Sequence, residues 1–366
     1  MNKKNLITTI LSLFLLLTFL SACSIQAEKA SEPKVESTEE SQVNEEKIDY
    51  QRFSAQFMGP FDTVTTVMGY SEDEESFQKV VNRIQSELER GDHLFTIYDK
   101  YPEVTSLKEV NENASKEAVE VDPLVIEFLQ RSLEISKESE GKLNIAMGAV
   151  LKLWHDAREP ELHEPPKREM LEEGAKHINP EDLVLDPKEN TIFFNDPEMS
   201  LDVGAVAKGM MVEKIAQDLK EDEIQHYLIS AGGNVRAIGP KPDGSPWIIG
   251  VRNPEGPEAD FLDTVEIMDG SVVTSGIYER YFEYEGRIYH HIIDPDTLEP
   301  TQLYRSLTVI CEDSGIADAL STSLFIMDEE SGDQLAEKFD AAVLRQYDDS
   351  GKIVGNPKWQ EYKKED

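Results

Sequence analysis

The chain has 366 residues and a formal net charge of −37, with 36 lysines and arginines against 73 aspartates and glutamates. This acidic excess argues against nucleic-acid binding, which needs a basic face, and against direct adhesion to anionic lipid. Only two cysteines occur, Cys23 and Cys311. Because Cys311 lies in an apolar run typical of a buried strand, we expect no intramolecular disulfide.

The N-terminus carries the pattern of an export signal. A basic start is followed by an apolar stretch from Leu6 to Leu20 and then by Leu-Ser-Ala-Cys, which ends at Cys23. The apolar stretch is too short and wrongly flanked for a membrane-spanning helix. The tetrapeptide resembles the lipobox of bacterial lipoproteins, so we predict a signal peptide over residues 1–22 and lipid on Cys23. The alternative is an ordinary cleaved signal with a chance cysteine.

Residues 23–49 are predicted to form a disordered acidic tether. They contain no aromatic residue, and such a segment buries too little apolar surface to offset its ordering entropy. A random coil of this length reaches roughly 30 Å. We therefore expect the protein at the cell membrane, on its extracytoplasmic face, attached through lipid only.

Residues 50–366 are long enough for one folded domain with a sizeable core. Apolar residues at helical spacing predict a helix over 77–94. Asp122 and Pro123 predict the start of a second helix, which closes near Gly141. Segments 183–185 and 191–194 read as a hairpin, and residues 155–180 as a surface excursion. Further helices are expected at 206–219 and 315–327, and strands at 227–230, 247–251, 281–284, 288–293, 307–311 and 341–347.

Strands in this pattern mostly follow strands, and helices are interspersed irregularly. The pattern favours an α+β fold with mixed sheets over a doubly wound parallel sheet.

Two corners of small residues could approach a phosphate. The run Leu201-Asp-Val-Gly-Ala-Val-Ala-Lys-Gly209 leads into a helix, whose first amides and dipole favour an anion. Lys208 adds a charge suited to a diphosphate, and Asp202 could hold a ligand hydroxyl. The run Ile229-Ser-Ala-Gly-Gly-Asn-Val235 also permits close backbone approach. Simple packing explains the first corner equally well, and a tight turn explains the second.

A pair of adjacent histidines, His290 and His291, is expected on a strand that ends at Asp294-Pro295. Neighbours on a strand face opposite sides, so only one of the two can enter a given site. A histidine there could act as a general base toward a hydroxyl. The alternative is a purely structural role.

A third pattern, Ala317-Asp-Ala-Leu-Ser-Thr-Ser323, lies within a predicted helix. Asp318 and Thr322 are four residues apart and share one helix face. A carboxylate and a hydroxyl are hard oxygen ligands that suit Mg²⁺, which keeps waters and substrate phosphate in its shell. An ordinary polar helix face would give the same pattern.

The order and spacing of these motifs resemble the ApbE-like flavin transferases, which are FAD:protein FMN transferases. The resemblance extends from about Phe53 to Met327. The matching stretches are Phe61-Asp-Thr63, Phe95-Thr-Ile-Tyr98, Leu143-Asn-Ile-Ala-Met-Gly148 with Trp154, Asp202 to Gly209, Gly232-Gly-Asn234, Thr274-Ser-Gly276, His291-Ile-Ile-Asp-Pro295 and Ala317-Asp-x-x-Ser-Thr322.

The resemblance implies a role for individual positions. Positions that contact FAD in the family correspond to Phe61, Tyr98, Ala146, Met147, Gly148, Asp202, Lys208 and Ile292. The metal would be held by the carbonyl of Ala205, by Asp318 and by Thr322, with Ser321 as a further ligand option. His291 matches the family's histidine. The chain departs from the family pattern at Ala205 and Leu298, which replace common glycines, and at Met210, which replaces a common tyrosine.

The implied reaction is Mg²⁺-dependent transfer of FMN from FAD to a threonine or serine of an acceptor protein, with release of AMP. Either His291 or Asp294 would take the proton of the hydroxyl. The implied acceptors are extracytoplasmic flavin-carrying electron-transfer proteins with a segment like Asp-Gly-x-Thr-Gly-Ala-Thr. Two other functions stay open, an Mg²⁺-dependent FAD pyrophosphatase and a non-catalytic flavin-binding lipoprotein.

Overall fold

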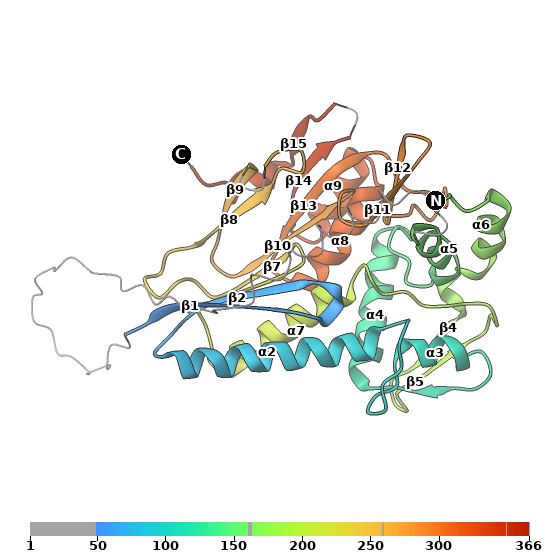
Figure 1. The fold of residues 1–366 in the computed structure, drawn as a ribbon, viewed down its shortest axis with the longest axis horizontal. Coiled ribbons are helices and arrows are strands. Elements are labelled where there is room, and N and C mark those ends of the chain that lie inside the picture. The colour runs from blue at the N-terminus through green and yellow to red at the C-terminus, as the bar shows by residue number, and fades with distance from the viewer. Residues whose placement is uncertain (1–48, 160–162, 258–259, 349, 366) are drawn as a thin grey trace, which may run out of the picture.

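The computed structural model describes residues 49–159, 163–257, 260–348 and 350–365. The predicted signal peptide, Cys23 and all but the last residue of the predicted tether lie outside these ranges. The described chain is built around an eight-stranded sheet in the order β1-β2-β6-β7-β10-β13-β14-β15 (Figure 1). Every neighbouring pair in this sheet is antiparallel.

The strands of this sheet come from both ends of the described chain. Their bounds are β1 Gln51–Met58, β2 Val64–Ser71, β6 Tyr227–Ala231, β7 Asn234–Ile238, β10 Gly270–Gly276, β13 Tyr304–Cys311, β14 Ala342–Tyr347 and β15 Ile353–Gly355. The pairing of β2 with β6 joins Val67 to Ile229 across a long stretch of intervening chain. The sheet therefore forms only when distant parts of the sequence meet.

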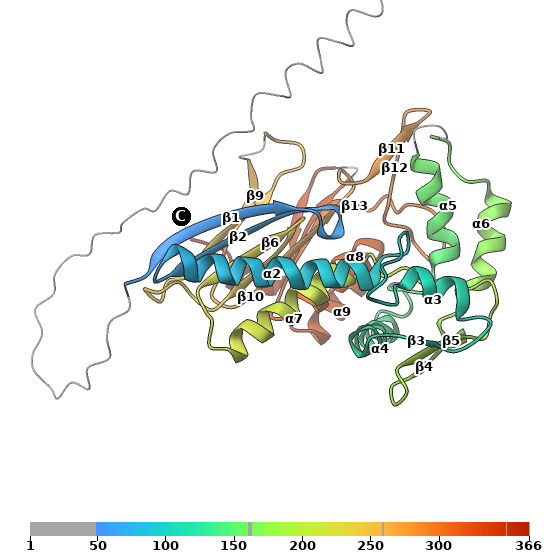
Figure 2. The same cartoon turned by 60° about the horizontal axis from the view of Figure 1, so that its bottom comes forward.

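Both faces of the sheet are covered. Helices α2 (Glu74–Phe95), α7 (Ala207–Glu221), α8 (Ser314–Ile326) and α9 (Glu329–Lys338) lie on one face, as Figure 2 shows. The ribbon of β8 (Trp247–Arg252) and β9 (Phe261–Ile267) covers the other, together with the 3₁₀ helix Pro357–Glu361. Residues of β13 alternate accordingly, with Val309 in the helical core and Ile310 in the core beneath the ribbon.

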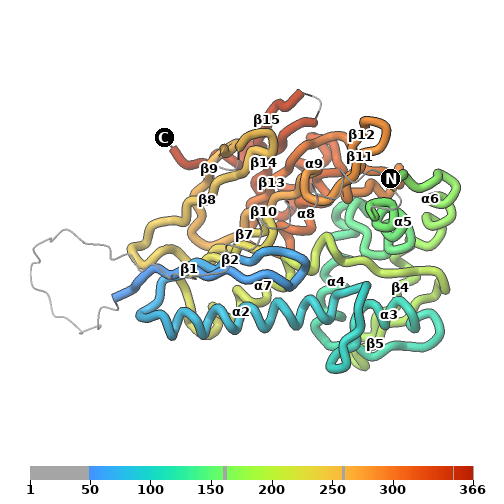
Figure 3. The backbone as a smooth tube through the Cα atoms, viewed as in Figure 1, coloured from blue at the N-terminus to red at the C-terminus, as the bar shows by residue number. Residues whose placement is uncertain are grey.

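A second, mostly helical part packs beside one end of the sheet (Figure 3). It contains α3 (Leu107–Asn113), α4 (Pro123–Glu138), α5 (Gly148–Arg158) and α6 (Arg168–Gly174), with a small sheet of β3 (Val119–Glu120), β5 (Thr191–Phe194) and β4 (Leu183–Asp186). The hairpin of β11 (Tyr281–Tyr284) and β12 (Arg287–His290) folds onto α5. Short 3₁₀ turns occur at Pro60–Asp62, Ala175–His177 and Pro180–Asp182.

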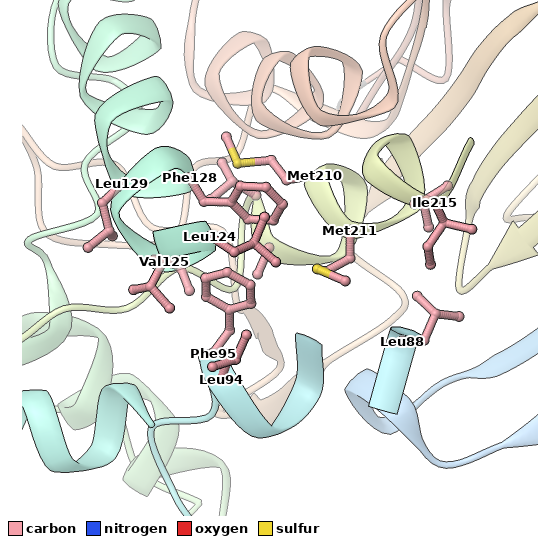
Figure 4. Close-up of a cluster of buried hydrophobic side chains, with 14 of the residues drawn as sticks. Leu88, Leu94, Phe95, Leu124, Val125, Phe128, Leu129, Met210, Met211 and Ile215 are labelled. Carbon is pink, nitrogen blue, oxygen red and sulfur yellow. The ribbon is translucent and has the colours of Figure 1, made fainter. Parts of the chain in front are cut away.

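One hydrophobic cluster joins the two parts. Leu88 and Phe95 of α2, Phe128 of α4, and Met210 and Met211 of α7 point toward one another (Figure 4). Phe95 and Phe128 stack with ring centroids 5.1 Å apart. Burying an apolar side chain of this size contributes about 1.5–3 kcal/mol. The start of α7 is therefore held firmly against the helical part.

The predicted α+β class is confirmed, as are the hairpin at 183–194 and the buried free thiol of Cys311. The strand expected over 288–293 is wrong beyond His290, because the amide of Ile292 turns back to His290 Nδ1 at 3.2 Å. The excursion expected at 155–180 contains the end of α5 and all of α6. Among the described residues no helix is both long and apolar enough to cross a bilayer.

Candidate active site

The start of α7 is held between two other segments of the chain. Before the helix, the amide of Asp202 donates to the carbonyl of Ile145 at 2.9 Å, and the amide of Gly148 donates to Ser200 at 3.0 Å. In the first turn of the helix, the Gly209 amide donates to Asp318 Oδ2 at 2.8 Å. The first small-residue corner of the sequence thus lies where the 143–148 loop, α7 and α8 meet.

Two glycines are required by this close packing. A Cβ at position 148 would lie 2.5 Å from Ser200 Oγ, and a Cβ at position 209 would lie 2.4 Å from the Cβ of Asp318. Glycine is required at positions 232 and 233 for a different reason. Gly232 and Gly233 have φ of +49° and +83°, a backbone conformation that favours glycine. They connect β6 to β7 in a tight turn, as the alternative interpretation of that motif expected.

Asp318 is the central charge of the site. Its side chain lies on α8, and the residue is only 7% exposed. Lys208 Nζ lies 3.3 Å from Asp318 Oδ1. The carboxylate thus has one amide and one ammonium partner, which together balance its burial.

Thr322 lies on the same helix as Asp318, one turn later, and is half-buried. Its hydroxyl forms no hydrogen bond within the described residues, whereas Ser321 Oγ contacts both the Asp318 carbonyl and Ser275 Oγ at 2.8 Å. Ser321 is therefore already engaged, and Thr322 is the freer of the two oxygens. Ala205 is half-buried in the turn that precedes α7.

A single carboxylate is what this site offers to a cation. The described residues hold no group of three or more His, Cys, Asp or Glu side chains suited to a metal. An Mg²⁺ ion bound with substrate needs few protein ligands, because phosphate and water complete its shell. Asp318, the free hydroxyl of Thr322 and the carbonyl of Ala205 fit that requirement in their chemistry.

Asp202 stabilises the turn that leads into α7. Its Oδ1 accepts from the Gly204 amide at 2.9 Å. Burial raises the pKa of the Asp202 carboxyl, and the opposing influences are this hydrogen bond and the nearby charges of His155, Arg158 and Arg280. The sequence motifs gave no indication of these three basic residues.

Tyr98 lies beside His155 and is 57% exposed. Its hydroxyl lies 3.4 Å from Nδ1 of His155, and Nη2 of Arg158 lies 2.9 Å from the same nitrogen. Burial and the neighbouring charge of Asp202 raise the pKa of Tyr98. The ring of His155 lies 5.1 Å from that of Tyr98, and the exposed part of the Tyr98 ring can stack on a flat ligand.

Phe61 has an unusual backbone. Its φ of +56° lies in the left-handed region, and its amide donates to Asp92 Oδ1 at 3.0 Å. Burial raises the pKa of Asp92, a residue that the sequence motifs did not single out. Strained residues of this kind cost about 1–3 kcal/mol and cluster at functional sites. Phe61 packs against the main core.

Three of the residues matched to FAD contacts have buried side chains, namely Ala146, Met147 and Ile292. Ile292 lies in the core formed by β10, β13 and α8. These three positions can therefore offer a ligand only their backbone. The amide of Ala146 already donates to Asn144 Oδ1 at 2.9 Å.

His291 and His290 have different partners. His290 Nε2 lies 2.6 Å from the Thr301 carbonyl, and the residue is buried. His291 is half-buried, and its Nδ1 donates to the carbonyl of Arg280 at 3.3 Å. A carbonyl only accepts, so the hydrogen is on Nδ1 and the lone pair is on Nε2. Burial, followed by the charges of His290, Arg158 and Arg280, lowers the pKa of His291 to about 3.

The turn after His291 is held to the segment around α5. Lys142 Nζ lies 3.1 Å from Asp294 Oδ1 and 2.7 Å from Asp296 Oδ2. Leu298, which replaces the family glycine, keeps a φ of +64° and accepts a bond from Trp154 Nε1 at 2.9 Å. The substitution therefore leaves the left-handed turn intact.

Two cavities, of about 350 and 330 Å³, lie beside the hairpin and away from α7. Both are lined by Ile277, Ile288, Arg305 and Asp348. None of the residues matched to FAD or metal contacts lines either cavity. The candidate site is thus an assembly of α7, α8 and the 143–148 loop, with His291 nearby, and is separate from these cavities.

The antiparallel sheet with its covering helices, and the lysine and buried carboxylate at the start of α7, define an α+β protein with a site suited to a diphosphate. Residues 58–344 match the ApbE family, and the chain belongs to that family. It is 31% identical over 281 residues to the FAD:protein FMN transferase of Klebsiella pneumoniae (strain 342), covering 76% of this chain and 82% of the relative. The transferase of Treponema pallidum (strain Nichols) is 32% identical over 247 residues, covering 64% of this chain and 68% of the relative.

Solved structures show the same similarity. The ApbE protein of Thermotoga maritima superposes with a TM-score of 0.77 at 30% identity, covering 86% of this chain and all of that one. The flavin transferase ApbE of Vibrio cholerae gives a TM-score of 0.72 at 26% identity, covering 84% of this chain and 99% of its own. The resemblance inferred from the motifs is confirmed.

Proposed function

We propose that this protein transfers FMN from FAD to a threonine or serine hydroxyl of an acceptor protein. The observation that carries the proposal is the convergence of Lys208, the Gly209 amide and Asp318 at the start of α7. Lys208 can neutralise part of the charge of a diphosphate at one end of a substrate, and Asp318 can hold a cation that neutralises the rest. The exposed ring of Tyr98 supplies a surface for the flavin at the other end.

The chemistry is a phosphoryl transfer. The hydroxyl oxygen of the acceptor attacks the phosphorus on the FMN side of FAD, and the bond from that phosphorus to the bridging oxygen breaks. AMP leaves with the bridging oxygen, and the hydroxyl proton passes to a base. His291 Nε2 carries a free lone pair for this proton, and Asp294 is the other candidate. Lys208 stabilises negative charge on the diphosphate.

Mg²⁺ belongs to the same proposal. Asp318, Thr322 and the Ala205 carbonyl would hold it, and the ion would supply charge stabilisation to the diphosphate. Lys208 already contacts the Asp318 carboxylate, so the lysine and the ion would both bind Asp318. The lysine can retain the carboxylate in its position when the cation is absent.

Location follows from the N-terminal sequence. We propose export, lipid attachment at Cys23 and a tether that places the folded domain just outside the membrane. Acceptors within reach would be membrane-associated electron-transfer proteins. A covalent bond keeps the flavin on such a carrier, whereas free FMN would diffuse away.

The test incubates the full chain with FAD, Mg²⁺ and such an acceptor domain. Flavin fluorescence of the denatured acceptor band and release of AMP are measured together. Transfer gives both signals, hydrolysis of FAD gives AMP alone, and a storage protein gives neither. Free FMN should not replace FAD, because it lacks the AMP leaving group. Release of AMP with an unmodified acceptor would favour the pyrophosphatase.

A further inference from the structure

The last turn of α2 holds the backbones of both aromatic residues that match flavin contacts. The amide of Phe61 donates to Asp92 Oδ1 at 3.0 Å. The amide of Tyr98 donates to Thr96 Oγ1 at 3.2 Å. Asp92 and Thr96 are one helical turn apart, and the Thr96 amide closes the helix on the Asp92 carbonyl at 3.0 Å. One short segment of the chain therefore contacts the backbone of both rings.

This last turn is itself firmly held. Leu94 and Phe95 are buried, and Phe95 stacks on Phe128 in the cluster of Figure 4. Directly after the helix, the carbonyl of Thr96 accepts from the amide of Lys108 at 2.9 Å. The side chains of this turn therefore project from a backbone that the core keeps in place.

The turn that carries Phe61 needs such support. Phe61 and Asp62 have φ of +56° and +53°, although neither is a glycine. Two successive left-handed residues of this kind are unfavourable and persist only where the surroundings fix them. The amides of Asp62 and Thr63 donate to carbonyls within the turn at 3.1 and 3.3 Å, whereas the Phe61 amide donates to the Asp92 side chain. The Asp92 carboxylate thus stabilises the left-handed backbone of Phe61 from outside the turn.

Helix energetics disfavour an acid at position 92. Helix α2 ends at Phe95, so Asp92 lies in the last turn, where a helix carries partial negative charge. The residue is half-buried, and burial raises the pKa of its carboxyl, with the charge of Asp62 acting in the same direction. The stability of the helix alone would therefore favour a neutral residue here.

The basic residues next to Asp92 do not compensate for this cost. Arg90 and His93, its basic neighbours on the helix, lie 2.7 and 3.3 Å from other carboxylates. Among the residues that the structure describes, no basic side chain forms an ion pair with Asp92 within 4.0 Å, and the Phe61 amide is the donor to its carboxylate. Local conflicts of this kind are typical of residues that serve a site.

We propose that Asp92 is a positioning residue that fixes Phe61 for contact with the flavin of FAD, and that Thr96 fixes Tyr98 in the same way. The inference rests on the proposed function, in which both rings pack at the flavin end of the substrate. Asp92 acts through the Phe61 backbone and touches no reacting atom. Without its carboxylate the turn can leave the left-handed conformation, which moves the ring and leaves the diphosphate end of the site unchanged.

The test measures the two ends of the substrate separately on the full chain. FMN carries the flavin without the adenosine half of FAD, and ADP carries a diphosphate without the flavin. Asp92→Ala should raise the dissociation constants of FAD and FMN by about tenfold, followed by flavin fluorescence, because one hydrogen bond to a charged acceptor is lost. The dissociation constant of ADP, measured by calorimetry, should not change. In the transfer assay the KM for FAD should rise while kcat changes little.

Conservative variants separate the oxygen from the charge. Asp92→Asn keeps Oδ1 as an acceptor, so it should bind FMN like wild type. It should also melt at the same temperature or higher, because a negative charge leaves the end of the helix. Thr96→Val removes the oxygen that accepts from Tyr98 and should weaken FMN binding, whereas Thr96→Ser should restore it.

The matched control is Glu89→Ala, which removes an exposed acid from the same helix. Glu89 contacts Gln85 Nε2 at 2.8 Å, and its loss should leave the binding of FMN and ADP unchanged. If Asp92→Ala unfolds, Asp92→Gln takes its place. Glutamine is a good helix former, but its oxygen lies one methylene further from the backbone and misses the Phe61 amide.

Three outcomes overturn the inference. Wild-type affinity for FMN in Asp92→Ala would show that Phe61 does not depend on the carboxylate. Equal losses of FMN and ADP affinity would show general damage to the site. The same loss in Asp92→Asn as in Asp92→Ala would assign the effect to the charge and reject the hydrogen bond as its cause. Absence of FMN transfer by wild type would contradict the proposed function, and the binding constants would still decide the role of Asp92.

Discussion

Gly209 and Asp318 touch across the contact between α7 and α8, although 109 residues separate them. The Gly209 amide donates to the Asp318 carboxylate, and a side chain at 209 would collide with the Cβ of Asp318 at 2.4 Å. The residue type at 209 is thus set by the distance between the two helices. Any substitution there must move the carboxylate or the helix that carries Lys208.

The first prediction concerns this contact. Gly209→Ala should destabilise the fold by about 1–3 kcal/mol through overpacking and should lower FMN transfer sharply, because Asp318 is displaced. Thermal melting and initial rates measure the two effects. Gly91→Ala is the matched control, since Gly91 lies in α2 against the flexible side chain of Met211. Full activity in Gly209→Ala would show that the site tolerates a shift of Asp318.

A second prediction distinguishes the contribution of the Thr322 hydroxyl from that of the side-chain volume. Thr322→Val keeps the volume and removes the hydroxyl, so the Mg²⁺ concentration needed for half-maximal activity should rise by about tenfold or more. Thr322→Ser keeps the oxygen and should resemble wild type. The measurement is activity against Mg²⁺ concentration at saturating FAD. Equal Mg²⁺ requirements in both variants would remove Thr322 from the metal site.

The third prediction is a pH profile. The pKa of His291 is lowered from 6.5 to about 3, so the free protein holds this side chain neutral through the usual working range. We expect kcat/KM for FAD to show no acidic limb near pH 6.5 that depends on His291. His291→Gln should lower kcat by about 10²–10⁴-fold if it is the base. A limb near pH 6.5 that vanishes in His291→Gln would contradict the lowered pKa.

The lowered pKa of His291 also makes the stability of the fold depend on pH. The folded-state pKa lies below the unfolded-state value, so the unfolded chain takes up the proton first as the pH falls. The contribution of a neutral His291 is therefore present above about pH 6.5 and is lost progressively toward pH 3. Relative to His291→Gln, wild type should lose more stability over this interval.

A fourth prediction concerns the buried ion pair between Glu213 and Arg236. Arg236 is only 1% exposed, and its Nε lies 2.8 Å from Glu213 Oε2, which also accepts from the Ser314 amide at 2.7 Å. The pair thus ties α7 to the first residue of α8. Removing one partner leaves a buried charge, so Glu213→Gln should cost about 3–5 kcal/mol.

Arg236 also contacts Asp269 at 2.5 Å, and this second carboxylate should limit the loss in Glu213→Gln. The double variant E213Q/R236M should be more stable than the sum of the two single effects predicts, because no unpaired charge is left at the pair. Chemical denaturation of the four proteins measures the coupling. Additive losses would show that the two side chains act independently.

The fifth prediction tests the anchor. Cys23→Ser should shift the protein from the membrane fraction to the soluble fraction, because the lipid is the proposed attachment. Immunoblots of the two fractions provide the measurement, and purified FMN transfer activity should be unaffected. Membrane retention equal to wild type would reject lipid attachment at Cys23.

Sequence patterns predicted the long helices well, since each carries a local signal. The helix expected at 77–94 runs from Glu74 to Phe95, capped by Asp73, and the helix expected at 315–327 runs from Ser314 to Ile326. Strand β10 was not predicted because its sequence, Gly-Ser-Val-Val-Thr-Ser-Gly, carries little strand signal. It is extended because β7 and β13 pair with it on both sides.

The candidate site was predictable only in part, for a similar reason. Asp202, Lys208 and Asp318 belong to local motifs, and the placement of Lys208 on α7 and of Asp318 on α8 follows the helix pattern. Arg158 and Arg280 belong to no motif, since one ends α5 and the other lies between β10 and β11, far away in the sequence. The hydrogen bond to Asp92 likewise forms only because the backbone of Phe61 is left-handed, which no local pattern indicates.

The pairing of β2 with β6 has a consequence for how the protein matures. Strand β2 ends at Ser71, and its partner begins only at Tyr227, so the sheet cannot close until more than half of the chain is available. Contacts over such separations slow folding. Asp318 and Thr322 come later still. A chain that ends before these residues therefore lacks part of the site, so that only chains synthesised in full can be active.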